Sequence, residues 1–163
     1  IHSTSWLTTN NGYKNELKWA IYFIKRSIQK GKQSMPNKTY AIEWLDRSKR
    51  NLDTAVLLFS HNHYTDVIVI DIHQTLEKAF KAVYAYYGIS IPRTHTLLPL
   101  FEFVITKIEI SGVTIDDILI ISDYYEADRY PGPKYFLPSI EETALNLDLA
   151  KRIFNTVERH INQ

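Results

Sequence analysis

The stretch between residues 71 and 81 carries titratable side chains at the spacing of an α-helix. His73, Glu77 and Lys81 follow one another at i, i+4 and i+8, which on a helix forms one stripe with an acid between two potential cations. Three further polar residues form a neighbouring stripe, namely Asp71, Gln74 and Lys78. Such a ridge can bind an anionic ligand or a second subunit, and we expect it to remain reachable beside the buried apolar stripe. A solvated exterior with i, i+4 pairs explains the pattern equally well.

Two more candidates follow later in the chain, each with a structural alternative. His95 lies near an expected helix start, where its ring can bind a phosphate or, as we favour, brace the preceding loop. Arg129 and Tyr130 precede a Pro-Gly-Pro loop, and an arginine fork beside an aromatic ring suits the phosphate and base of a nucleotide. Pairing of Arg129 with Asp128 or Glu126, with Tyr130 packed on the bundle, is the simpler interpretation.

The composition excludes several kinds of catalytic centre. The sequence has no cysteine, which rules out disulfides, thiolate nucleophiles and cysteine-ligated metal sites. It contains no P-loop, no dinucleotide-binding glycine fingerprint and no zinc-binding His-Glu helix motif. The triplet His61-Asn62-His63 lacks nearby carboxylates and lies where two helices should connect. We therefore interpret it as a polar turn and expect no metal site.

The net charge of +1 conceals two segments of opposite sign. Residues 1–34 contain six Lys or Arg and one acid, whereas residues 35–163 contain thirteen Lys or Arg and seventeen acids. A net acidic body is not expected of a protein whose affinity comes mainly from neutralising a phosphate backbone. No apolar run approaches the ~18 residues that a membrane-spanning helix needs, and residues 1–34 do not resemble a signal peptide. We expect a cytoplasmic protein without a membrane partner.

The apolar periodicity predicts helices along the whole chain. A basic amphipathic helix is expected at about 13–30. The body of the chain predicts five more helices, at about 39–59, 63–87, 96–107, 114–127 and 139–161. Because short connections make neighbouring helices antiparallel, we predict an all-α, up-and-down antiparallel bundle of about five helices over residues 35–163. Residues 1–34 are predicted to form an N-terminal extension helix.

Turn and capping residues mark the expected helix ends. Gly88 is a natural stop for the helix at 63–87. Thr94 or Thr96 can cap the next helix, and Thr114 can open the one after it, where Asp116 and Asp117 favour the positive end of the helix dipole. Ser139 and Glu142 have the spacing of a capping box at the start of the last helix.

Two helices have well-defined apolar faces. The helix at 39–59 is expected to turn five residues inward, namely Ile42, Leu45, Leu52, Val56 and Phe59. The core face of the helix at 63–87 is expected to comprise Ile68, Ile72, Leu76, Ala79, Val83 and Tyr86 or Tyr87. The isoleucine-rich run from Ile105 to Ile121 also suits strands, with Ser111-Gly112 as a hairpin turn. We favour helix–turn–helix there because the neighbouring segments are helical.

Four stretches together resemble the HEPN family in their order and spacing. They are Ala41-Ile42-Glu43-Trp44-Leu45; His73-Gln74 with Glu77-Lys78-Ala79 and Lys81-Ala82; Pro92 with Thr94-His95 and Leu97; and Arg129-Tyr130-Pro131-Gly132 with the helix from Ser139. The resemblance covers about residues 39–160. It implies a bundle of about five helices, commonly a homodimer, that is found as a nucleotide-binding or substrate-binding partner of minimal nucleotidyltransferases. Other branches of the family are metal-independent ribonucleases.

The resemblance also indicates which residues take part in binding. The positions that match the family are His73, Gln74, Glu77, Lys78, Lys81, His95, Arg129 and Tyr130. On this basis we expect a nucleotide-binding module, with a ligand such as ATP, that serves a minimal nucleotidyltransferase in a toxin–antitoxin-like pair. We assign it no catalytic residue of its own and no resident cofactor. A purely structural oligomerisation domain is a further alternative.

The ribonuclease branch has a signature that this chain lacks. In that branch an arginine is followed after four to six residues by a histidine, which can act as base while the arginine stabilises charge on the phosphate. Here Arg93 and His95 are too close, and Arg152 and His160 are too far apart. An endoribonuclease, with RNA as substrate, therefore ranks second; its base would be His73 or His95 and its electrophile Arg93 or Arg129.

Overall fold

The structure of the protein is a computed structural model that describes residues 37–129, 132 and 137–163. These residues form five helices, namely α2 Lys38–Ser60, α3 Thr65–Tyr86, α4 Leu97–Ile105, α5 Ile115–Arg129 and α6 Ile140–Asn162. The described part of the chain contains no β-strand. The all-α bundle predicted from periodicity is therefore confirmed. The extension helix predicted within residues 1–34 lies outside the described residues.

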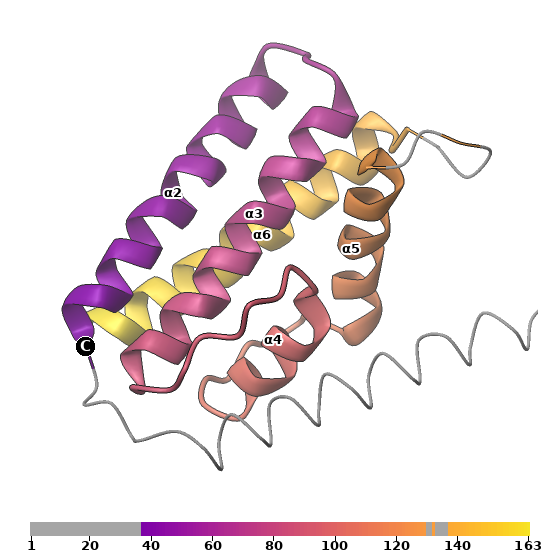
Figure 1. Ribbon diagram of the computed structural model, residues 1–163. Helices are drawn as coiled ribbons and strands as arrows, with labels where there is room; N and C mark the ends of the chain where they lie inside the picture. Colours follow the sequence, from indigo (N-terminus) through magenta and orange to yellow (C-terminus); the bar gives the residue numbers. More distant parts are fainter. Residues whose placement is uncertain (1–36, 130–131, 133–136) are drawn as a thin grey trace, which may run out of the picture.

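The long helix α3 is the centre of the bundle and contacts each of the other four helices (Figure 1). α2 and α3 form an antiparallel pair, and α6 packs against both of them. α4 and α5 lie on another side of α3 and contact each other. Among the described residues, no helix is long and apolar enough to cross a membrane.

The connection between α3 and α4 returns along α3 before α4 begins. Three contacts show this, because residues further along α3 contact residues further along the segment that follows it. Glu77 contacts His95, the ring of Phe80 lies 5.7 Å from that of Phe101, and the ring of Tyr84 lies 4.0 Å from that of Phe103. α4 therefore runs in the same direction as α3, whereas an up-and-down bundle would have these two helices antiparallel. The returning connection also brings His95 to the middle of α3.

The core face of α3 matches its sequence pattern, whereas that of α2 differs at one predicted position. All five aliphatic residues predicted for the α3 core are buried, while Tyr86 and Tyr87 are half-buried. On α2, Ile42 is 38% exposed and Ala41 is fully buried in its place. Small residues allow α2 to approach α3 closely, and the Ser48 hydroxyl donates a 2.7 Å hydrogen bond to the Thr75 carbonyl between them. The prediction that Ile42 points inward was wrong.

Side-chain capping bonds are present at the starts of α5 and α6 but not at the start of α4. The Ser139–Glu142 capping box is present, with the Glu142 amide donating to Ser139 Oγ at 3.0 Å and the Glu142 carboxylate accepting from the Ser139 amide at 2.7 Å. Thr114 Oγ1 likewise accepts from the Asp117 amide. Thr96 occupies the N-cap position of α4 but makes no side-chain cap bond. Gly88 has φ +65°, which suits the predicted stop.

The isoleucine-rich run forms two helices separated by a turn, as predicted. α4 ends at Ile105, α5 begins at Ile115, and a turn at Ser111-Gly112 lies between them, with Gly112 at φ +69°. β-branched residues have a high strand propensity, but burial against α3 outweighs it here. Ile118 and Ile121 are both fully buried.

Candidate functional site

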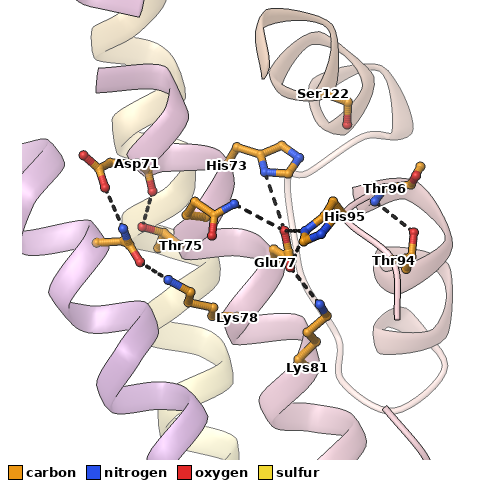
Figure 2. A network of polar contacts seen from close by, with 12 residues as sticks. Asp71, His73, Thr75, Glu77, Lys78, Lys81, Thr94, His95, Thr96 and Ser122 are labelled. Carbon is orange, nitrogen blue, oxygen red and sulfur yellow. Dashed lines mark hydrogen bonds and ion pairs between the residues drawn. The ribbon is translucent and has the colours of Figure 1, made fainter. Parts of the chain in front are cut away.

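A buried carboxylate on α3 is the centre of a polar network (Figure 2). Glu77 is 4% exposed, and its Oε1 accepts a 2.7 Å hydrogen bond from Lys81 Nζ one turn later on the same helix. Nδ1 of His95, from the connection that precedes α4, lies 3.2 Å from Oε1 and 3.1 Å from Oε2. Nδ1 of His73 lies 3.9 Å from Oε2 on the other side. Side-chain nitrogens of Lys81, His95 and His73 thus surround this carboxylate.

The partners of Glu77 favour its ionised form. Burial alone raises the pKa of a carboxyl group, but the hydrogen bonds and charges of Lys81 and His95 outweigh it and lower the pKa of Glu77. A buried ion is tolerated only when it is paired and hydrogen-bonded, and Lys81 and His95 meet both conditions. Glu77 therefore acts here as a fixed negative charge inside the bundle.

The predicted accessible stripe is for the most part sealed, which corrects the sequence interpretation. His73, Glu77 and Lys81 are 1%, 4% and 6% exposed. The ring of Tyr125, on α5, stacks on His73 with centroids 3.8 Å apart and planes within 6°. Lys81 Nζ lies 5.7 Å from the ring centroid of Trp44, on α2. The mutual pairing of the three polar side chains allows other helices to cover them.

His95 is the reachable member of this network. Its side chain is 60% exposed although Nδ1 rests on the buried Glu77 carboxylate. Because an ionised carboxylate can only accept hydrogen bonds, Nδ1 carries a proton. The other ring nitrogen, Nε2, can then accept a proton from a ligand or, when the ring is charged, donate to an anion. His95 ties the returning connection to α3, in keeping with the bracing role favoured from the sequence.

The neighbouring polar stripe is half-buried and joins α3 to α2. Asn51, on α2, accepts a hydrogen bond from Lys78 Nζ through Oδ1 and donates one of 2.6 Å to Asp71 through Nδ2. Burial lowers the pKa of Lys78, with the nearby carboxylates of Glu77 and Asp71 opposing that effect. Gln74 Nε2 lies 3.5 Å from Glu77 Oε2, at the limit of a hydrogen bond. Lys78 and Gln74 thus border the Glu77 network.

The remaining sequence candidates lie elsewhere or beyond the described side chains. Arg129 is the last residue of α5, and its side chain is not among those described. Tyr130 lies outside the described residues. Their proposed roles stay predictions. His61 and Asn62 form a turn in which His61 Nδ1 lies 2.9 Å from the Leu57 carbonyl oxygen, in keeping with the polar-turn interpretation.

Sequence reasoning missed three residues that shape this site. Asn51, Tyr125 and Trp44 contact Lys78, His73 and Lys81 respectively. Tyr125 is separated from His73 by fifty-two positions, and helical periodicity carries no information about such a pairing. Only Asn51 had a weak indication in the sequence that it lies near the core, because this polar residue directly precedes Leu52, which is buried.

Comparison with known proteins agrees with this fold. The chain is 33% identical over 107 residues to a protein of Methanocaldococcus jannaschii named "Putative toxin MJ1304", with 61% of this chain and 68% of the relative aligned. The crystal structure of TT1696 from Thermus thermophilus is similar with a TM-score of 0.61 and 23% identity, covering 73% of this chain and 96% of that one.

A second solved structure and a family match complete the comparison. ST0689, described as an archaeal HEPN homologue, is similar with a TM-score of 0.53 and 20% identity, covering 74% of this chain and 97% of that one. At these identities the two structures support the fold alone. The sequence model described as the HEPN domain matches residues 41–160, which include the whole Glu77 network. The chain is therefore a member of the HEPN domain family.

Proposed function

We propose that this chain is a nucleotide-binding HEPN subunit that serves a minimal nucleotidyltransferase in a toxin–antitoxin-like pair. The observation that carries the proposal is the exposed His95 imidazole seated on the buried Glu77 carboxylate. The carboxylate fixes the orientation of the ring and leaves its other nitrogen available at the surface, where a positively charged imidazole can donate a charge-assisted hydrogen bond to an anion. A nucleotide phosphate is an anion of this kind.

The surroundings of His95 suit the same ligand. Arg93 is exposed two residues before it and can reach a second phosphate oxygen. α4 begins two residues after it, and the amino end of a helix favours negative charge. Lys78 and Gln74 are half-buried beside Glu77 and can contact the rest of a bound nucleotide. His73, Glu77 and Lys81 support the site from beneath rather than touching the ligand.

The partnership with a nucleotidyltransferase rests on family membership and on the toxin named among the relatives. The proposal requires that this chain and the nucleotidyltransferase form a stable complex. We further propose that the chain is a cytoplasmic homodimer, which light scattering on the purified protein would measure.

Calorimetric titration tests nucleotide binding directly. ATP and the other nucleoside triphosphates are titrated into the purified protein, and the neighbouring nucleotidyltransferase is co-expressed with a tag on one partner. We expect saturable heat with at least one nucleotide, and recovery of both proteins together. Absence of heat with every nucleotide, together with no co-purification, would contradict the proposal.

A metal-independent endoribonuclease is the second candidate, and the Glu77–His95 contact also favours it. A carboxylate behind Nδ1 fixes the orientation and tautomer of His95 and leaves Nε2 free to accept a proton, as a general base for a ribose 2′-hydroxyl must. Arg93 is the exposed electrophile nearest to it in sequence. RNA is a ligand under this alternative only.

Cleavage of structured RNA in the presence of a chelator distinguishes the two candidates. Cleavage that persists in EDTA and is lost in both His95→Ala and Glu77→Gln would favour the ribonuclease. Cleavage that survives both substitutions indicates a contaminating nuclease. Lack of cleavage combined with nucleotide binding would favour the binding module. The structural-oligomer alternative predicts neither activity.

A further inference from the structure

A second polar cluster lies where α3 and α6 end, away from the Glu77 network. Residues from α6 and from the segment after α4 line a surface hollow of about 260 Å³. Its polar lining comprises Lys107, Glu109, Thr156, Arg159, His160 and Gln163. The hollow is smaller than the roughly 300–1,000 Å³ of pockets that enclose drug-sized ligands, so it suits a single small group. It lies beside Tyr87, ten residues beyond Glu77, or about 15 Å along a helix.

His160 is held in place within this cluster. Its Nε2 lies 2.8 Å from the Tyr87 hydroxyl, and its ring meets the Tyr86 ring edge-on with centroids 5.6 Å apart. Burial raises the pKa of Tyr87, so this hydroxyl stays protonated and can donate to Nε2. In that arrangement His160 carries its proton on Nδ1 and can donate it to a ligand.

Two exposed cations, Lys107 and Arg159, line the hollow together with His160. Lys107 Nζ rests over the rings of Tyr87 and Phe103, 5.3 Å and 5.9 Å from their centroids, and these contacts restrict the lysine. Arg159 uses Nε to donate to the Asn155 carbonyl, which leaves the ends of its guanidinium fork available. Among the described residues, neither Lys107 nor Arg159 has a carboxylate within ion-pair distance.

The residues that line the hollow have a net positive charge, whereas residues 35–163 as a whole have a net negative charge. Residues 35–163 carry a net charge of −4, since they contain thirteen Lys or Arg and seventeen acids. In the hollow Glu109 is the single acid among the lining residues, against two permanent cations and a histidine. Such a local excess of positive charge attracts anions, and cationic donors make strong charge-assisted hydrogen bonds to phosphate oxygens.

We propose that this hollow binds a phosphate monoester, with Lys107, Arg159 and His160 as its ligands. The group would be either a small phosphorylated metabolite or the terminal phosphate of an oligonucleotide, which present the same dianion. This site is separate from the nucleotide site at His95 and does not depend on it. The competing explanation is that these cations only stabilise the carboxyl ends of α3 and α6, where helix dipoles favour positive charge.

Titration with inorganic phosphate tests the site. The protein is His95→Ala throughout, so that the proposed nucleotide site does not contribute, and the side-chain signals of His160 and Lys107 are followed by NMR at constant ionic strength. We expect saturable shifts of both signals with phosphate and none with chloride. Lys107→Gln and Arg159→Gln should each weaken phosphate binding at least tenfold. Lys151→Gln, an exposed lysine elsewhere on α6, is the matched control and should leave binding unchanged.

Several outcomes would overturn the proposal. Shifts that do not saturate, or an equal loss of affinity in Lys151→Gln, would indicate non-specific attraction by charge. Thermal unfolding of the same variants tests the competing explanation. If Lys107→Gln and Arg159→Gln lower the melting temperature but leave phosphate affinity unchanged, the cations serve the helix ends alone.

Matched ligand pairs identify the source of the phosphate. AMP is compared with adenosine, and a 5′-phosphorylated oligonucleotide with its 5′-hydroxyl counterpart, again in the His95→Ala protein. The phosphorylated member of each pair should bind more tightly. A larger preference within the oligonucleotide pair would assign a nucleic-acid end, and equal preferences would assign small phosphorylated molecules. No preference in either pair would contradict the proposal.

Discussion

Nδ1 of the exposed His95 lies 3.1 Å from Oε2 of the buried Glu77, which joins the segment before α4 to the middle of α3. The two residues are eighteen positions apart, and the contact exists because the chain returns along α3 before α4 begins. Glu77 is buried and ionised, whereas the His95 side chain is accessible. This pairing places a buried carboxylate directly behind an exposed imidazole.

The buried Glu77–Lys81 ion pair should contribute strongly to stability. Lys81→Met keeps much of the side-chain volume but removes the ammonium group and leaves Glu77 with a weaker set of partners. Removing one partner of a buried pair costs about 3–5 kcal/mol. We therefore expect a loss in this range in the free energy of unfolding, measured by urea denaturation.

The Lys49–Asp53 pair provides the matched control for that measurement. It has the same i, i+4 spacing and a 2.8 Å separation, but its side chains are 53% and 63% exposed. Lys49→Met should cost no more than about 1 kcal/mol. Equal effects of Lys81→Met and Lys49→Met would show that burial of the Glu77 pair contributes nothing.

The lowered pKa of Glu77 predicts a specific dependence of stability on pH. Because the pKa is lower in the folded than in the unfolded protein, ionised Glu77 stabilises the fold fully above the unfolded value of about 4.3. That contribution is lost as the pH falls through the folded pKa. The melting temperatures of wild type and Glu77→Gln should therefore differ most at neutral pH and converge below about pH 4. A constant gap between them would contradict this assignment.

His73 should act through packing rather than through contact with a ligand. It is 1% exposed and its ring stacks on Tyr125, so His73→Phe can preserve the stack whereas His73→Ala leaves a cavity. We expect the alanine variant to be less stable than the phenylalanine variant by about 3–5 kcal/mol in chemical denaturation. His73→Phe should bind nucleotide as wild type does. A selective loss of nucleotide binding in a stable His73→Phe protein would place this ring in the binding site.

Two N-cap positions provide a contrast in local stability. Ser139 makes both bonds of a capping box, so Ser139→Ala should destabilise the protein by about 1 kcal/mol. Thr96 stands at the N-cap of α4 without a side-chain cap bond, so Thr96→Ala should remain within about 0.5 kcal/mol of wild type. Differential scanning calorimetry would separate the two effects. Equal losses would show that the capping geometry does not matter.

Local sequence signals predicted the helices well because helix formation here depends on nearby residues. The Ser139–Glu142 box, the Gly88 stop and the apolar period of α3 each act within a few turns, and all three appear as predicted. Ile42 shows the limit of this reasoning. Its hydrophobicity favours an inward position, but the small Ala41 occupies the contact instead because α2 and α3 pack closely.

The polar stripe of α3 at the site could be predicted from the sequence, whereas its accessibility and the residues that cover it could not. The i, i+4 spacing places His73, Glu77 and Lys81 on one stripe, as the structure confirms. Tyr125 from α5 and Trp44 from α2 cover that stripe. These contacts depend on how helices far apart in sequence are packed together, which no periodicity within α3 contains.

An NMR titration with ATP, following the ring signals of His95 in wild-type protein and in Glu77→Gln, asks whether these two residues together form a nucleotide site. We expect a saturable shift of the His95 signals in the wild type, with at least tenfold weaker binding in a Glu77→Gln protein that remains folded. Saturable ATP binding that leaves the His95 signals unmoved, or that is equally tight in Glu77→Gln, would contradict the proposed role of the pair.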